Sequence, residues 1–286
     1  MLVQPARRLV LAIKTDRAFA VTELLRALRR QVPFPAHARR VAWTPVFDHI
    51  TIRVADRAAA ERFYNTVLAT LGIGEPWTHN QYVGWGRDFS LASDDQPVTA
   101  GLHIGFAAPS RAHVDEFWRA GTEAGYDNDG APGVRPQYSD SYYGGFLRDP
   151  DGNSVEAVHH DSVSEAGTID HLWIRVANVS VSQRFYETIA PCAGFRLNRS
   201  APERAQFTGP SGSFSLVAGK PTKPFHLAFP AGDDATVDEF HRAATAAGYA
   251  DNGPPGERPI YHAGYYGAFV LDPDGHNVEV ANHNRG

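Results

Sequence analysis

Residues 252–279 read NGPPGERPIYHAGYYGAFVLDPDGHNVE, and residues 128–156 read NDGAPGVRPQYSDSYYGGFLRDPDGNSVE. The two stretches align without a gap once a single residue is dropped beside the first glycine. Further upstream, Asp48-His49-Ile50 corresponds to Asp170-His171-Leu172, and each of these motifs runs into an Arg-Phe-Tyr triplet. Matches of this length in the same order identify an internal repeat, so the chain holds two tandem copies of one unit.

The repeat divides the 286 residues into a leader and two domains. We expect residues 1–45 to form a basic helical leader, residues 46–161 the first domain and residues 168–286 the second domain. Hydrophobic residues make up 43% of the chain, which is enough for each domain to bury a core. The single cysteine, Cys192, excludes an internal disulfide.

Charge is unevenly distributed along the chain. Residues 1–42 contain nine Arg and Lys residues against two acidic ones, whereas the remainder contains eighteen basic and thirty acidic residues. We interpret the leader as a helix near residues 15–30 that docks on the acidic body or on a partner subunit, which leaves a homodimer open. A targeting segment and a nucleic-acid arm are the alternatives for the leader, although the acidic body argues against nucleic acid as the main ligand.

No apolar run in the sequence is long enough to span a bilayer, and no signal peptide is evident. These two features predict a protein without a membrane partner. They also make the cytoplasm the expected location.

The hydrophobic pattern of the first repeat switches between the strand and helix periods. Residues 49–54 alternate polar and apolar residues, as a half-buried strand does, and a helical pattern over residues 58–71 closes at Gly72. The order restarts with a strand at residues 102–106 and a helix at residues 111–124. Short strands are expected around residues 81–85, 89–92, 143–148 and 154–158, the last two joined by the turn Asp149-Pro150-Asp151-Gly152. The predicted order is βαβββ twice per repeat, which is an α+β fold class.

Strand alternation also selects candidate metal ligands. It places three polar side chains of the first repeat, His49, His103 and Glu156, on the face opposite their apolar neighbours. The matching side chains of the second repeat are His171, His226 and Glu279. Buried ionisable groups must be paired or coordinated, so such a set on a concave face suits a ligand pocket better than a core.

Taken together, the Asp-His strand, the Arg-Phe-Tyr helix, the strands at His103 and His226 and the Asp-Pro-Asp-Gly-x-x-x-Glu endings resemble the vicinal oxygen chelate superfamily. That superfamily includes glyoxalase I, the fosfomycin and bleomycin resistance proteins and the type I extradiol dioxygenases. The resemblance covers residues 46–284. It implies two tandem domains, each a pair of βαβββ units curled into an open cup that holds one divalent metal.

The resemblance further implies one metal triad within each repeat. The first triad would be His49, His103 and Glu156, and the second would be His171, His226 and Glu279. Two histidines and a carboxylate form a facial triad with open coordination positions, which suits Fe(II) best, with Mn(II), Zn(II) and Ni(II) as alternatives.

Two departures from relatives restrict the reaction. Glyoxalase I-like members carry a fourth ligand, a glutamate, where this chain has Ser90 and Ser215, which argues against a lactoylglutathione lyase. The extradiol signature is matched in spacing by His262 and Glu279, but Phe269 stands in place of its tyrosine. Ring cleavage of a catechol therefore stays one alternative among several.

Four further side chains are candidates for binding substrate. Arg53 and Arg175 share the ligand face of their strands, either as anchors for an anionic or carbonyl-bearing substrate or as rim arginines paired with surface acids. Tyr143 and Tyr266 are expected at the mouths of the cups. One tyrosine of each Tyr-Tyr pair should pack on the opposite face, because alternation separates neighbours.

The second repeat is expected to carry the more active site. His262, our candidate acid-base group, stands where the first repeat has Ser139, and His276 and His283 lie near its carboxylate ligand. Asp48 and Asp170, which precede the first histidine of each repeat, are interpreted as strand-end caps rather than as acceptors that orient a histidine ring.

These features favour a divalent-metal-dependent enzyme, an Fe(II) or Mn(II) oxidoreductase of the dioxygenase-like kind that acts on a small oxygenated or aromatic molecule. One alternative is a drug-sequestering resistance or binding protein without turnover. The other is a glyoxalase- or epimerase-like lyase or isomerase.

Overall fold

The computed structural model describes residues 46–161 and 167–284. The predicted basic leader, its helix and its docking on an acidic surface lie outside the described residues. Within the described part of the chain, no helix is long and apolar enough to cross a membrane.

The predicted order of elements, βαβββ twice in each repeat, is confirmed. The first repeat contains β1 (His49–Arg53), α2 (Arg57–Leu68), η1 (Ala69–Leu71), β2 (Trp77–His79), β3 (Tyr82–Trp85), β4 (Phe89–Ala92), β5 (His103–Ala107), α3 (Arg111–Glu123), β6 (Asn128–Val134), β7 (Tyr143–Arg148) and β8 (Ser154–His159). The second repeat contains β9 (Ile169–Val176), α4 (Val179–Ala193), β10 (Arg196–Ala201), β11 (Arg204–Thr208), β12 (Ser213–Ala218), β13 (His226–Pro230), α5 (Asp234–Ala246), β14 (Asp251–Glu257), β15 (Tyr266–Leu271) and β16 (Asn277–Asn282).

Two strands of the first repeat were not located by alternation, β2 and β6. Strand β6 reads NDGAPGV and pairs with β7 only through two register shifts, because Pro132 cannot donate to the ladder and the flanking glycines permit irregular backbone. Strand β2 has three residues and all of them are exposed, so no hydrophobic period marks it.

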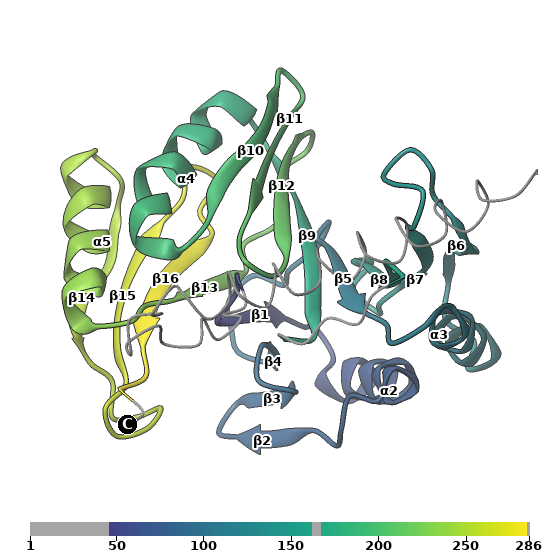
Figure 1. Cartoon of the computed structure of the whole chain (residues 1–286). Helices are drawn as coiled ribbons and strands as arrows, with labels where there is room; N and C mark the ends of the chain where they lie inside the picture. The colour runs from purple at the N-terminus through teal and green to yellow at the C-terminus, as the bar shows by residue number, and fades with distance from the viewer. Residues whose placement is uncertain (1–45, 162–166, 285–286) are drawn as a thin grey trace, which may run out of the picture. The chain divides into compact units, whose positions relative to one another are not determined.

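The strands form two open sheets of eight, and each sheet combines one βαβββ unit from each repeat. The first sheet has the order β14-β15-β16-β13-β1-β4-β3-β2, and the second has the order β10-β11-β12-β9-β5-β8-β7-β6. The seam of the first sheet is the antiparallel pair β1 and β13, and the seam of the second is the antiparallel pair β5 and β9 (Figure 1). The two halves of each sequence repeat therefore belong to different sheets.

One face of each sheet is covered by helices and holds the core. Ile50 and Ile52 of β1 are fully buried on this face, as alternation predicted, and Phe63 and Tyr64 of α2 are also fully buried. Helix α2 begins at Asp56, whose side chain accepts a hydrogen bond from the Ala59 amide. The predicted helix end at Gly72 is confirmed, although the last turn, η1, is a 3₁₀ helix.

The repeated Arg-Phe-Tyr and Asp-Pro-Asp-Gly motifs meet in space. The Tyr64 hydroxyl donates to the Asp149 carboxylate at 3.0 Å, and the same carboxylate accepts from the amides of Asp151 and Asn153. Tyr186 donates to Asp272 in the same way at 3.2 Å. These bonds fix the tight turn that leads into the strand carrying the glutamate, so the motif has a structural explanation.

The two copies of this turn differ at the residue after the glycine. In the first copy Asn153 is buried and fully bonded: its amide oxygen accepts from the Leu102 amide, and its amide nitrogen donates to the Thr99 carbonyl oxygen and to Asp149. In the second copy His276 is fully buried, and within the described residues neither ring nitrogen has a hydrogen-bond partner. Burial lowers the pKa of His276 to about 4.

We predict that His276→Asn stabilises the protein by about 1–3 kcal/mol, because asparagine can make the bonds of its counterpart where histidine leaves two polar atoms unsatisfied. The gain should grow as the pH falls. The unfolded chain protonates His276 below its ordinary pKa of 6.5 and the folded chain only near 4, so the wild type loses stability through this window and the variant does not. Urea titrations at pH 7.5 and pH 5 measure both effects, and a destabilised variant at both pH values would contradict the prediction.

Candidate metal centres

The first cluster consists of His49, His226 and Glu279, and the pairing of three neighbouring strands produces it. His49 of β1 lies opposite Ala228 of β13, and Ala228 lies beside Glu279 of β16, so the three residues form one row across the sheet. The small central side chain leaves room for the two outer ones to converge above it. His226, two residues before Ala228, points from the same face of β13.

The ligand atoms of the first cluster are spaced as a single ion requires. The Nε2 atom of His226 lies 2.9 Å from His49 Nε2 and 3.0 Å from Glu279 Oε2, and His49 Nε2 lies 3.7 Å from Glu279 Oε2. Two ligand atoms that are each about 2.1 Å from one ion lie about 3.0 Å apart at a right angle and about 3.4 Å apart at the tetrahedral angle. The donor set and its spacing therefore fit a divalent metal.

The second cluster, His103, Glu156 and His171, repeats the arrangement in the second sheet. Here His171 of β9 and Glu156 of β8 flank Gly105 of β5 in one row. The Nε2 atom of His103 lies 3.0 Å from Glu156 Oε2 and 3.1 Å from His171 Nε2, and the remaining separation is 3.3 Å. These three spacings also fit one ion.

The expectation of one triad within each repeat is wrong. The structure groups His49 with His226 and Glu279, and it groups His171 with His103 and Glu156. The physical reason is the exchange of βαβββ units between the sheets, because β1 pairs with β13 and β9 pairs with β5. All six residues lie in clusters, but each cluster combines both repeats.

This grouping predicts how pairs of substitutions act on metal binding. His49→Ala with His226→Ala removes two ligands from the first cluster, so it should abolish binding there and leave the second cluster intact. His49→Ala with His103→Ala removes one ligand from each cluster, so it should weaken both. Isothermal titration with Zn(II) distinguishes the two patterns, and grouping by repeat would require the opposite result.

A tyrosine orients the carboxylate in each cluster. The Tyr265 hydroxyl donates to Glu279 Oε1 at 2.7 Å, and the Tyr142 hydroxyl donates to Glu156 Oε1 at 2.7 Å. Burial and the adjacent carboxylate raise the pKa of both tyrosines well above the ordinary value, so each hydroxyl stays a donor. A Cβ atom at Gly267 would lie 2.6 Å from Glu279 Oε1, so the approach of the carboxylate requires glycine at this position.

The substrate-binding prediction for Tyr143 and Tyr266 selected the wrong tyrosine of each pair. Their hydroxyls donate to Asp115 of α3 and Asp238 of α5, on the helix-covered face. The register of the final hairpins explains this, since Phe269 lies opposite Glu279 and residues of its parity face the cup. Counting back from Phe269 would have selected Tyr265.

Tyr265→Phe tests the outer bond to the carboxylate. We expect it to lower the affinity of the first cluster for Zn(II) by about 10- to 100-fold, because loss of an outer hydrogen bond frees the ligand to reorient. The matched control is Tyr266→Phe, which removes a hydroxyl on the opposite face and should leave the affinity unchanged. Equal effects of the two substitutions would show that the bond to Glu279 does not support metal binding.

Asp48 and Asp170 orient the histidine that follows them, so their interpretation as strand-end caps is wrong. Asp48 Oδ1 lies 2.7 Å from His49 Nδ1, and Asp170 Oδ1 lies 2.8 Å from His171 Nδ1. Burial alone would raise the pKa of the Asp48 carboxyl, but its bonds to His283 and His49 hold that pKa well below the ordinary range. Each aspartate directs Nε2 of its histidine into the cluster.

His262, the predicted acid-base group, reaches the first cluster only through His283. His262 Nε2 lies 2.8 Å from His283 Nδ1, and His283 Nε2 lies 2.8 Å from Asp48 Oδ2. The outer ends of the pair face acceptors, the Ala263 carbonyl oxygen and the Asp48 carboxylate. His283 is the member of the pair that lines the cavity.

The two arginines lie at the rims of the cups. Arg53 Nε donates to Asp94 at 3.0 Å, and Arg175 donates to the Gly101 carbonyl oxygen at 2.6 Å. Arg53 therefore has the surface acid that a rim arginine requires, while both side chains still line their cavities.

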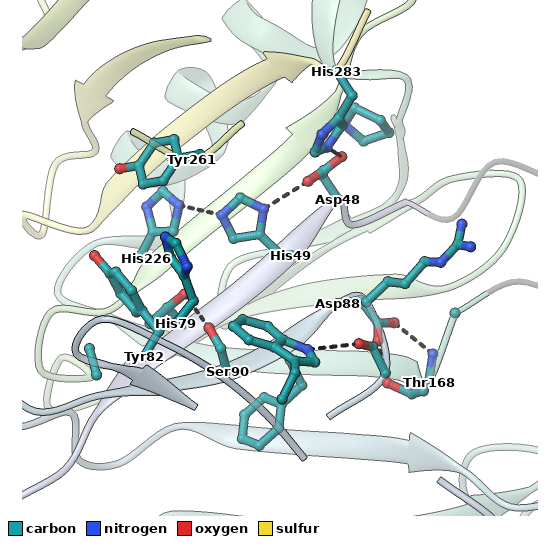
Figure 2. Close-up of a pocket in the computed structure, with 18 of the residues that line it drawn as sticks. Asp48, His49, His79, Tyr82, Asp88, Ser90, Thr168, His226, Tyr261 and His283 are labelled. Carbon is teal, nitrogen blue, oxygen red and sulfur yellow. Dashed lines mark hydrogen bonds and ion pairs between the residues drawn. The ribbon is translucent and has the colours of Figure 1, made fainter. Parts of the chain in front are cut away.

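The two clusters open into cavities of very different size. His49 and His226 of the first cluster line a cavity of about 1000 Å³, and all three residues of the second cluster line a cavity of about 210 Å³. Figure 2 shows the side chains of His79, Tyr82 and Tyr261 around His226 in the larger cavity. Thr51 of β1 corresponds to Trp173 of β9. The bulky Trp173 side chain lines the smaller cavity and takes up part of its space.

The expected ranking of the two repeats needs correction, because each cluster combines residues of both repeats. The features that favoured the second repeat, His262 and His283, belong to the cluster that contains His49. His171 lies in the smaller cavity instead. The structure therefore assigns the accessible cup to His49, His226 and Glu279.

Alternation did not identify the aromatic rim of the larger cavity. Trp77 is 42% exposed and Tyr261 is 43% exposed, and both line this cavity. The Trp77 indole donates to the Gly86 carbonyl oxygen at 3.0 Å, which fixes the ring. The sequence signal for cups of unequal size was the difference between Thr51 and Trp173, which stand at the same position of matched strands.

Comparison with known proteins agrees with this architecture. The family model of the Glyoxalase/Bleomycin resistance protein/Dioxygenase superfamily matches residues 46–157 and 168–280. Glyoxalase I from Zea mays superimposes with a TM-score of 0.61 at 18% identity, covering 83% of this chain and 92% of that protein. A putative dioxygenase from Bacillus subtilis superimposes with a TM-score of 0.59 at 14% identity, covering 84% and 86%. An uncharacterized protein from Pseudomonas aeruginosa is 33% identical over 130 residues, which is 40% of this chain and 87% of that protein.

Proposed function

Since the chain belongs to the Glyoxalase/Bleomycin resistance protein/Dioxygenase superfamily, we propose that the first cluster is the metal centre of an enzyme. The metal would be Fe(II) or Mn(II), and the enzyme an oxidoreductase of the dioxygenase-like kind. Its substrate would be a small oxygenated or aromatic molecule.

The observation that carries the proposal is a cluster of three protein donors, two of which, His49 and His226, line a large cavity. Two histidines and one carboxylate leave coordination positions open, which is typical of non-haem Fe(II) sites that use O₂. When bound, the metal would supply Lewis acidity and a place for substrate oxygens and O₂ beside one another. The position of a fourth ligand is Ser90, whose hydroxyl bonds to Thr51 at 2.8 Å instead.

The remaining lining residues would bind and orient the substrate. Trp77, whose indole is held by its bond to Gly86, and Tyr261 offer aromatic surfaces to an apolar body. Tyr265 holds Glu279, and Asp48 holds His49, so the donor atoms keep their directions while a substrate exchanges. Arg53 at the rim would attract an anionic or carbonyl group.

The lyase or isomerase alternative requires a base beside the substrate. Among the described residues that line the cavity and are not cluster ligands, the candidate bases are Asp48, Asp88, His79 and His283. Asp48 accepts from two histidines, and Asp88 accepts from the Thr168 amide at 2.6 Å and the Ile169 amide at 3.1 Å. Both carboxylates are engaged, and so are both ring nitrogens of His283, which favours the oxidoreductase. His79, whose Nε2 bonds to Asn80 at 3.1 Å, keeps the lyase or isomerase as an alternative.

A sequestering protein without turnover is the second alternative, and the aromatic rim favours it. It would need no metal, so metal content separates it from the enzyme. It would also bind a planar ligand equally well with and without the ion.

The test is oxygen uptake by protein loaded with Fe(II) or Mn(II) without air, over a panel of catechols, hydroxyquinols and hydroxy acids. We expect uptake with at least one substrate, and we expect His226→Ala to abolish it, because that variant loses a ligand of the accessible cluster. The matched variant His103→Ala removes the equivalent ligand of the second cluster and should retain uptake. Failure of the first cluster to bind either metal, or full uptake by His226→Ala, would refute the proposal.

A further inference from the structure

The second cluster is covered by a tryptophan that has no counterpart over the first. Trp173 of β9 lies opposite His103 of β5, and its ring contacts the His103 ring at a centroid distance of 6.1 Å and an angle of 64°. The Tyr138 ring contacts the indole edge-on at a centroid distance of 5.7 Å. In the first sheet the matching residue is Thr51, which lies opposite His226.

Arg204 fixes the tryptophan in place. Its guanidinium group lies 4.4 Å from the centre of the Trp173 ring, a stacking contact in which cation and ring attract one another. The Nε and Nη2 atoms of Arg204 donate to Ser215 Oγ at 3.2 and 3.0 Å, which holds the guanidinium over the ring. By strand register the counterpart of Arg204 is Tyr82, so the first cup lacks this cation.

The cover leaves about a fifth of the space that the first cup offers. The cavity of about 210 Å³ corresponds to about seven water molecules at roughly 30 Å³ each. Pockets for drug-sized ligands begin at about 300 Å³. The His171 side chain is 7% exposed, against 24% for His49 at the matching position.

An ion in this cluster would join the two repeats. His171 comes from the second repeat, whereas His103 and Glu156 come from the first, and all three lie at the β5–β9 seam. Coordination by residues distant in sequence stabilises a fold, because the unfolded chain has no preformed site.

We propose that the second cluster holds a divalent cation as a structural ion, which Trp173 and Arg204 retain and shield from substrate. The chain then binds two ions of different lability, one exchangeable in the open cup and one retained at the seam of the second sheet. This inference concerns a different cluster from the proposed catalytic centre and does not depend on the reaction proposed there.

The experiment loads the full chain with Zn(II) and follows its release to the chromogenic chelator 4-(2-pyridylazo)resorcinol. We expect two ions per chain, with the second released more slowly than the first by about tenfold or more. His226→Ala should remove the fast phase and His103→Ala the slow phase. The melting temperature should fall when the slow ion leaves and change less when the fast ion leaves.

A matched exchange of residues tests the cover itself. Trp173→Thr copies the open cup and should convert the slow phase into a fast one, while Thr51→Trp should slow release from the first cluster. Arg204→Gln removes only the stacked cation and should also speed the slow phase, so it replaces Trp173→Thr if that variant does not fold. Three results would each overturn the proposal. The first is two ions with equal release rates, and the second is slow release that both Trp173→Thr and Arg204→Gln leave unchanged. The third is one ion per chain that His103→Ala leaves in place. Oxygen uptake enters none of these readouts, so failure here is distinct from failure of the proposed function.

Discussion

The antiparallel pairing of β1 with β13, and of β5 with β9, is the interaction on which both candidate centres depend. Neither repeat carries a complete cluster within one sheet, because its two βαβββ units are separated into different sheets. The pairing places a histidine, a small residue and a glutamate in one row, and the small residue allows the outer side chains to converge. A slip of one residue in either seam would turn the seam histidines toward the helix-covered face, so register and ligand geometry are one constraint.

Exchange between repeats also explains how the two cups could diverge while their ligands stayed equal. Each cup is lined by residues of both repeats, and the two cups share no lining residue, so a substitution in one lining alters only one cup. Thr51 and Trp173 stand at the same place in their strands, yet the cavities that they line differ in volume by about 790 Å³. The ligand triads constrain three positions per sheet, and the rims are free to differ because they do not touch the ion.

The sequence predicted the elements, the faces of the strands and the six candidate ligands, because these depend on local periodicity and on an internal repeat. It did not predict which halves pair, since equivalent units present equivalent edges and alternation carries no information on the partner strand. The choice between Tyr142 and Tyr143 failed for a related reason. Alternation separates the two rings, but only the register against β8 says which one faces Glu156. Asp48 was misplaced because the strand pattern describes backbone direction, whereas its carboxylate turns back to reach the His49 ring.

The outer hydrogen bonds make the first cluster electrostatically distinct from the second. Asp48 is bonded to His49 at 2.7 Å and to His283 at 2.8 Å, and His283 is in turn bonded to His262. Asp170 has only His160 in the equivalent place, at the longer distance of 3.3 Å, and Ser139 stands where a second histidine would be needed. A carboxylate with a strong second partner donates less electron density to its imidazole, so the ion in the open cup would be the stronger Lewis acid of the two. The accessible cavity and the more polarising donor set therefore coincide, which is the combination that a catalytic metal requires and a structural one does not.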